Sequence, residues 1–151
     1  ISTSPTTDDP TRLIIRRYFN APRDAVFRAL VEPALLSRWM GPGLDWTVPE
    51  ISVDAQVGGR YRLVMRSPEG SEHPVGGEFL VIDPPDRLVY SWAWENNPAS
   101  VTRVTYDLRD GDDGGTRLTL THDRFSEVTV RDRHGIGWNG CLDRLEAAAT
   151  S

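Results

Sequence analysis

The sequence is poor in several residue types, and each shortage excludes a class of chemistry. Its 151 residues include one cysteine, Cys141, so no internal disulfide and no multi-cysteine zinc site can form. All 17 basic residues are arginine, and without lysine there is no side-chain amine to form a Schiff base. No apolar run approaches the roughly 18 residues of a membrane span. The formal net charge of -5 argues against a general nucleic-acid-binding protein.

Length and composition predict one domain. A chain of this size typically buries about 70% of its unfolded surface, which is enough for a single core. Residues 1–11 are polar and contain no signal-peptide core, so we expect a disordered lead-in, a domain over residues 12–149 and a cytoplasmic location.

The segment from Phe19 to Pro42 predicts two short helices. Pro22 suits the first position of a helix, and Pro33 ends that helix and can begin a second one. Gly41 and Pro42 follow as stop signals. The apolar positions of the pair, at helical spacing, are Val26, Phe27, Ala29, Leu30, Leu35, Leu36, Trp39 and Met40.

Strands are predicted on both sides of this helical pair. The strand Arg12–Phe19 precedes it, and short turn segments rich in Gly, Pro, Asn and Asp separate the later strands, as is typical of antiparallel neighbours. The six later strands are predicted at Trp46–Val53, Arg60–Arg66, Val75–Ile82, Leu88–Glu95, Val101–Arg109 and Thr116–His122.

Alternation along the strands predicts which side chains face the interior. The strand Val75–Ile82 is ambiguous, because Phe79 and Val81 face one way while Glu78 and Leu80 face the other. The inward side chains on the other strands are Tyr61, Leu63, Met65, Leu88, Tyr90, Trp92, Trp94, Val104, Tyr106, Leu108, Leu118, Leu120 and His122.

A final helix is predicted from a point after Ser126 to about Ala149. Its apolar stripe is formed by Trp138, Cys141, Leu142, Leu145 and Ala149, and His134 lies one turn before Trp138 on the same side. Gly135, Gly137 and Gly140 are poor helix formers. They indicate either a close approach or empty space beside the helix, or an irregular first turn, and both interpretations stay open.

Two motif matches fail on their context. Gly135-Ile136-Gly137-Trp138-Asn139-Gly140 matches a dinucleotide-binding fingerprint, but no second strand follows it. The acidic run that begins at Asp110 would need glutamate where Thr121 stands to form a calcium loop. The histidines His73, His122 and His134 have no metal-ligand spacing. We therefore expect no metal and no cofactor.

His122 and the tryptophans are the residues to which a function is most readily assigned. Parity points His122 inward, where a hydrogen-bonded core histidine is favoured over an acid–base or ligand-binding residue. Trp39, Trp92 and Trp138 come from three different elements and are predicted to face one interior. An apolar cavity with a few polar groups is the usual form of a small-molecule site.

Several of these motifs together resemble a known family. The motifs are Ala21-Pro22 with Val26 and Leu30, Trp39, Gly58-Gly59-Arg60-Tyr61, Asp83-Pro84-Pro85-Asp86-Arg87-Leu88, the run from Thr116 to His122, and Gly137-Trp138 with Leu142 and Leu145. Over about residues 12–149 the chain resembles the START-like helix-grip superfamily, in the branch named after the activator of the heat-shock protein 90 ATPase. The resemblance implies an α+β fold, in which a curved antiparallel sheet of about seven strands surrounds a long C-terminal helix.

The same resemblance implies a cavity between the sheet and the long helix, but it carries no shared catalytic motif. Our first hypothesis is a cytoplasmic, bacterial binding protein for a small apolar or aromatic molecule, in a stress or resistance role. The expected ligand-binding residues are Phe27, Trp39, Met40, Tyr61, Leu63, Met65, Phe79, Tyr90, Trp92, His122, His134, Trp138, Cys141 and Leu142. Trp39 and Met40 are expected at the cavity mouth.

Two other hypotheses stay open. The chain is expected to act as a chaperone-partner module if its sheet carries a docking face, although full chaperone activators are expected to have an additional N-terminal domain. The third hypothesis is a cyclase or hydratase that uses His122 as an acid or base. No second catalytic group is evident beside His122, so an enzyme is not favoured. We expect a monomer or homodimer with no nucleic-acid or membrane partner.

Overall fold

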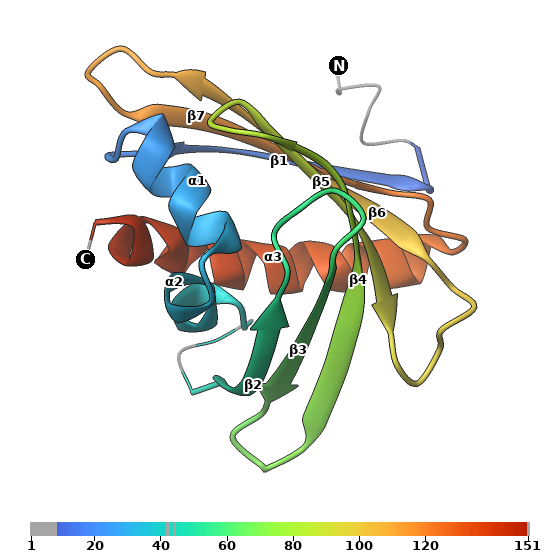
Figure 1. Ribbon diagram of the computed structural model, residues 1–151. Coiled ribbons are helices and arrows are strands. Elements are labelled where there is room, and N and C mark those ends of the chain that lie inside the picture. The colour runs from blue at the N-terminus through green and yellow to red at the C-terminus, as the bar shows by residue number, and fades with distance from the viewer. Residues whose placement is uncertain (1–8, 42, 44, 151) are drawn as a thin grey trace.

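In the computed structural model, which describes residues 9–41, 43 and 45–150, a curved sheet forms one layer and three helices cover its concave side (Figure 1). The predicted lead-in lies, for residues 1–8, outside the described residues. In chain order the elements are β1 (Arg12–Phe19), α1 (Arg23–Val31), α2 (Pro33–Trp39), β2 (Thr47–Val53), β3 (Arg60–Arg66), β4 (Glu72–Asp83), β5 (Arg87–Trp94), β6 (Thr102–Asp110), β7 (Thr116–Asp123) and α3 (Val128–Ala149).

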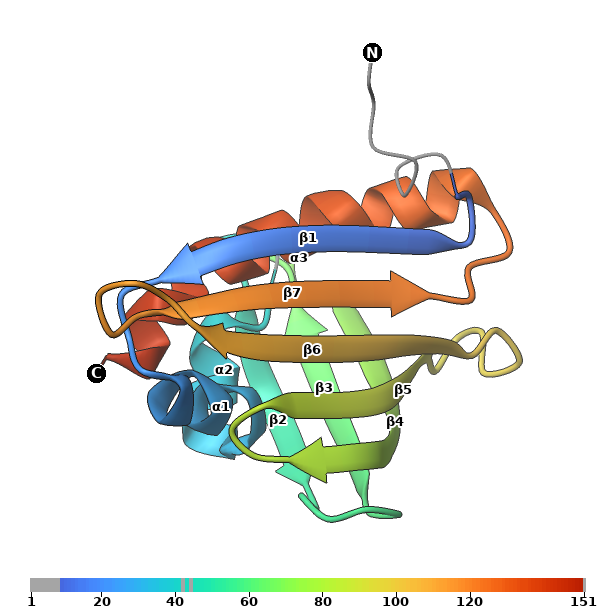
Figure 2. The same ribbon diagram turned by 90° about the horizontal axis from the view of Figure 1, so that it is seen from above.

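All neighbouring strands are antiparallel, in the order β1-β7-β6-β5-β4-β3-β2. Figure 2 shows β1, β7 and β6 side by side, with β2 and β3 running steeply across them, so the sheet wraps around α3. This arrangement confirms the predicted α+β helix-grip fold. The described strands depart from the predicted bounds by at most three residues, the largest difference being the earlier start of β4 at Glu72.

Strand β4 curves along its length (Figure 1) and approaches β5 closely at Gly77. A Cβ atom on Gly77 would lie 1.9 Å from the Ser91 carbonyl oxygen, so only glycine permits this approach of the two strands. There the Tyr61 hydroxyl donates to the Ser91 carbonyl oxygen at 2.6 Å, and the Glu78 backbone N–H donates to Ser91 Oγ at 2.8 Å. Side chains therefore satisfy backbone groups at the bend.

A register shift explains why the facing of β4 was ambiguous. Phe79 pairs with Tyr90, but Val81 pairs with Val89, so one extra residue, Leu80, is inserted. Phe79 is 3% exposed, whereas Leu80 and Val81 are 43% and 38% exposed. The bulge thus turns two apolar side chains away from the core.

The helical pair forms as predicted, with one difference. Pro22 is the N-cap of α1 rather than its first residue, whereas Pro33 opens α2 as expected. Trp39 is fully buried, and its indole N–H donates to the Ala29 carbonyl oxygen at 2.8 Å, which fastens α2 to α1. Of the two predicted stop signals, Pro42 lies outside the described residues.

The long helix α3 packs against the concave side of the sheet and against α1 and α2 (Figure 1). Its buried residues are Gly135, Trp138, Cys141, Leu142, Leu145 and Ala148. Polar contacts fix it at the edge strand, where Arg17 donates to Asp143 Oδ1 at 2.9 Å and to Asn139 Oδ1 at 2.8 Å. Within the part of the chain that the structure describes, no helix combines the length and apolarity needed to cross a lipid bilayer.

Candidate functional site

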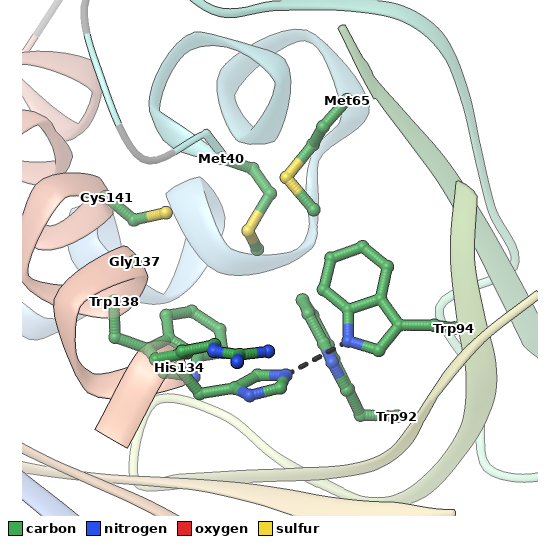
Figure 3. A pocket seen from close by; sticks show the side chains of 9 residues that line it. Met40, Met65, Trp92, Trp94, His134, Gly137, Trp138 and Cys141 are labelled. Atoms are coloured by element: carbon green, nitrogen blue, oxygen red, sulfur yellow. Dashed lines mark hydrogen bonds between the residues drawn. The ribbon is translucent and has the colours of Figure 1, made fainter. Parts of the chain in front are cut away.

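A cavity of about 180 Å³ lies between α3, the end of α2 and strands β3 and β5 (Figure 3). Its wall is almost wholly apolar, because sulfur atoms and aromatic rings make up most of it. The lining residues are Met40, Met65, Trp92, Trp94, Arg133, His134, Gly137, Trp138 and Cys141.

One wall of the cavity is a stripe on α3. His134, Trp138 and Cys141 follow one another at spacings of four and three residues, which places them on one face of the helix. Gly137 lies between them on the same face and also lines the cavity. The glycine therefore leaves room where any other residue would project a side chain.

The opposite wall is formed by two tryptophans of β5. Trp92 and Trp94 are two residues apart, so both point to the concave side of the sheet. Their ring centroids are 5.5 Å apart at an interplanar angle of 89°, and the Trp92 ring contacts the Trp138 ring of α3, with centroids 5.3 Å apart. Three indoles from two elements thus form a continuous aromatic surface.

Two methionines complete the enclosure, one from α2 and one from β3. Met40 follows the last residue of α2, where the Arg144 side chain donates to the Gly41 carbonyl oxygen and the Gly41 N–H donates to Cys141 Sγ at 3.2 Å. Met65 is 5% exposed on the inward face of β3. Methionine side chains are flexible and polarizable, so this side of the cavity can adapt to its occupant.

His122 lies behind Trp92 and Trp138, in a buried chain of three hydrogen bonds. The Trp138 indole N–H donates to His122 Nδ1 at 2.9 Å. Because an indole N–H only donates, the ring proton is on Nε2, which donates to Thr102 Oγ1 at 2.7 Å. The Thr102 hydroxyl in turn donates to the Trp92 carbonyl oxygen at 3.1 Å. Burial lowers the pKa of His122 well below its usual 6.5, and the nearby His134 lowers it further, so the imidazole is neutral.

His134 forms a second, more exposed hydrogen bond at the rim of the cavity, where the Trp94 indole N–H donates to His134 Nε2 at 3.0 Å (Figure 3). On its other side, His134 Nδ1 donates to the Val130 carbonyl oxygen at 2.8 Å. Burial lowers the pKa of His134, although the bond to Val130 opposes this shift. The pair joins α3 to β5.

Two groups in the cavity wall bear on what it can hold. The Trp92 indole N–H is buried and has no hydrogen-bond partner among the described residues. An unpaired buried donor is costly to the folded state. Burial raises the pKa of Cys141 to about 11, although the Gly41 N–H and Arg144 oppose the shift, so the thiol is protonated and unreactive.

The structure separates the fourteen expected ligand-binding residues into two groups. Those in the cavity wall are Met40, Met65, Trp92, His134, Trp138 and Cys141. Those in the surrounding core are Phe27, Trp39, Tyr61, Leu63, Phe79, Tyr90, His122 and Leu142. Binding by either group stays a prediction, but the expected placement of Trp39 at the mouth is wrong, because its side chain is fully buried in the core and its indole N–H is bonded to Ala29.

Much of the core group fills the other part of the space between sheet and helix. The Tyr90 and Tyr106 hydroxyls are 2.7 Å apart, and the Tyr61 ring lies 4.8 Å from the Tyr90 ring. Phe79 packs edge-on against Tyr90 at 5.9 Å. These rings pack on one another, so the cavity is confined to the end of the sheet near Trp92.

Three lining residues were not expected, namely Trp94, Arg133 and Gly137. Parity had placed Trp94 on the inward face, and the glycines of α3 had indicated empty space as one of two interpretations. Arg133 is exposed, and it lies one residue before His134, at the edge of the apolar stripe. Only the packing of α3 against β5 shows that it borders the cavity.

Comparison with known proteins identifies the family. A family model described as "Activator of Hsp90 ATPase homolog 1-like protein" matches residues 20–150. No curated protein gives a significant match.

Solved structures share the fold over nearly the whole chain. Protein NE0264 from Nitrosomonas europaea is 28% identical, with a TM-score of 0.80 over 95% of this chain and 96% of that one. Protein CV1439 from Chromobacterium violaceum is 23% identical, with a TM-score of 0.84 over 95% and 99%. CalU16 from Micromonospora echinospora is 30% identical, with a TM-score of 0.69 over 91% and 75%.

Proposed function

The chain belongs to the family of activator of Hsp90 ATPase homolog 1-like proteins, and we propose that it binds a small apolar or aromatic molecule. The observation that carries this proposal is the apolar cavity enclosed by Trp92, Trp138, Met40 and Met65. The cavity is open to the surface beside Arg133 and His134, so a small molecule could enter it. Small-molecule sites are typically apolar and largely pre-formed, as this one is.

The size of the cavity limits the occupant. An engineered protein cavity of about 150 Å³ stays dry and binds benzene. The cavity of about 180 Å³ therefore suits one aromatic ring with a short substituent.

Binding without turnover is preferred over catalysis because His122 is fully engaged. Both ring nitrogens already have hydrogen-bond partners, and the residue is not part of the cavity wall. Among the described residues, no group of three or more His, Cys, Asp or Glu side chains could hold a metal ion. Sequestration of a toxic aromatic compound, in a stress or resistance role, is the physiological extension of this proposal.

Docking on a chaperone is the alternative that the family description suggests. A docking face would require a contiguous exposed apolar or charged patch. In the described part of the chain the exposed large apolar side chains are dispersed over several elements and loops. These side chains are Tyr18, Val57, Leu80, Val81, Val101, Val128 and Ile136. Of these, only Leu80 and Val81 are adjacent in the chain, and two side chains fall short of a large contiguous patch, so ligand binding is the better supported function.

Toluene and indole, followed by tryptophan fluorescence and thermal shift, are suitable probes for the cavity. We expect saturable quenching and a raised melting temperature, because the three cavity tryptophans would contact the probe. Gly137→Leu should abolish binding by filling the cavity, whereas Gly137→Ala should retain part of it. Alanine and leucine have similar helix propensities, so the difference between the variants reports on volume rather than on helix stability. Equal binding by both variants would refute the proposed site.

A further inference from the structure

The apolar cavity adjoins a larger groove on the protein surface. This groove, of about 520 Å³, is bordered by Glu72 and His73 of β4, and it shares Trp94, Arg133 and His134 with the cavity. The hydrogen-bonded pair Trp94–His134 therefore lies at the boundary between the two spaces. A molecule whose ring occupies the cavity would place its substituent beside these three residues.

The charges at this boundary are not balanced. Glu72 is neutralised by Arg66, whose Nη2 lies 2.7 Å from the carboxylate. The Arg133 side chain forms no ion pair or hydrogen bond with any residue among 9–41, 43 and 45–150. The unpaired charge facing both spaces is therefore the positive guanidinium of Arg133.

We propose that the natural occupant is an aromatic acid, with its ring in the cavity and its carboxylate on Arg133 where the cavity meets the groove. This inference rests on the proposed binding function and specifies its ligand class. The cavity wall contains no other charged side chain, and an unpaired carboxylate is costly to bury, so the acid group must lie at the boundary. The planar guanidinium fork matches a carboxylate in a two-point hydrogen bond.

Phenylacetate and phenylacetamide form a matched pair of probes, because they have nearly the same shape and differ in charge. Measured by isothermal titration calorimetry at low salt, phenylacetate should bind at least about tenfold more tightly than the amide. Arg133→Gln should reduce the affinity for phenylacetate to that for the amide and leave the amide unchanged. Arg133→Glu should weaken phenylacetate further through repulsion.

A matched control separates a local contact from a change in net charge. Arg16 is exposed on β1 and does not line the cavity or the groove, so Arg16→Gln should leave both affinities unchanged. The inference is overturned if the amide binds as tightly as the acid, or if Arg133→Gln leaves the ratio of the two affinities unchanged. Binding of toluene and indole would in that case still support the proposed function. If none of the four probes binds, the proposed function itself fails.

Discussion

The hydrogen-bond chain behind the aromatic wall leads to a quantitative prediction for Thr102→Val. Valine has nearly the shape of threonine, but it can neither accept from His122 Nε2 nor donate to the Trp92 carbonyl oxygen. His122 is 0% exposed and Thr102 is 6% exposed, so water cannot replace the lost partner. The imidazole N–H would remain buried and unpaired.

The expected loss follows from the cost of one orphaned donor. A buried polar group left without a partner costs about 1–3 kcal/mol, so we expect the free energy of unfolding to fall by about 2 kcal/mol. For a domain of this length, 1 kcal/mol corresponds to about 2–4 °C, so the melting temperature should fall by about 4–8 °C. Thr102→Ser, which keeps the hydroxyl, should recover at least about half of this loss.

Urea unfolding followed by far-UV circular dichroism measures the change directly. The control is Thr119→Val, because Thr119 is only partly buried on β7 and its hydroxyl makes no hydrogen bond with another described residue. We expect the control to stay within about 0.5 kcal/mol of the parent protein. A loss below that value for Thr102→Val would show that His122 is not held by this chain, and the reasoning would be refuted.

Three further predictions concern titration, reactivity and backbone packing. The pKa values of His122 and His134 are lowered in the folded state, so the unfolded state binds more protons. The contribution of both histidines to the free energy of unfolding is therefore fully present above pH 6.5 and is lost as the pH falls below it, by up to about 1.4 kcal/mol per pH unit for each histidine. Urea unfolding between about pH 5 and 8 measures this loss. Cys141, with its pKa raised to about 11, should react with Ellman's reagent at pH 8 only as fast as the protein opens, and at once in denaturant. Gly77→Ala should lower the free energy of unfolding by about 1–3 kcal/mol in the same assay, because its Cβ would meet the Ser91 carbonyl oxygen.

The fold could be predicted from the sequence because local residue patterns mark most of its helices and strands. Alternation and turn residues mark the strands, and Pro33 marks the division between the two short helices. The facing of β4 could not be predicted, since the inserted residue at Leu80 changes the period within one strand. A bulge is recognised only when the neighbouring strand is in place.

The candidate site was predictable in part for a related reason. Trp92 and Trp138 follow from strand parity and from helical spacing, and both line the cavity. Strand parity also predicts that Tyr61 and Tyr90 point inward, but their rings contact each other in the core and do not line the cavity. Whether an inward side chain contacts a neighbour or an empty space depends on the curvature of the sheet, which no local pattern encodes.

The pairing of the first strand with the last has a consequence for synthesis of the chain. Arg12 pairs with Asp123, so β1 leaves the ribosome about 100 residues before β7, its neighbour in the described sheet, exists. The part of the concave face that α3 covers, which includes Trp92, stays open until that helix emerges later still. The nascent chain therefore exposes this apolar surface until α3 has been synthesised.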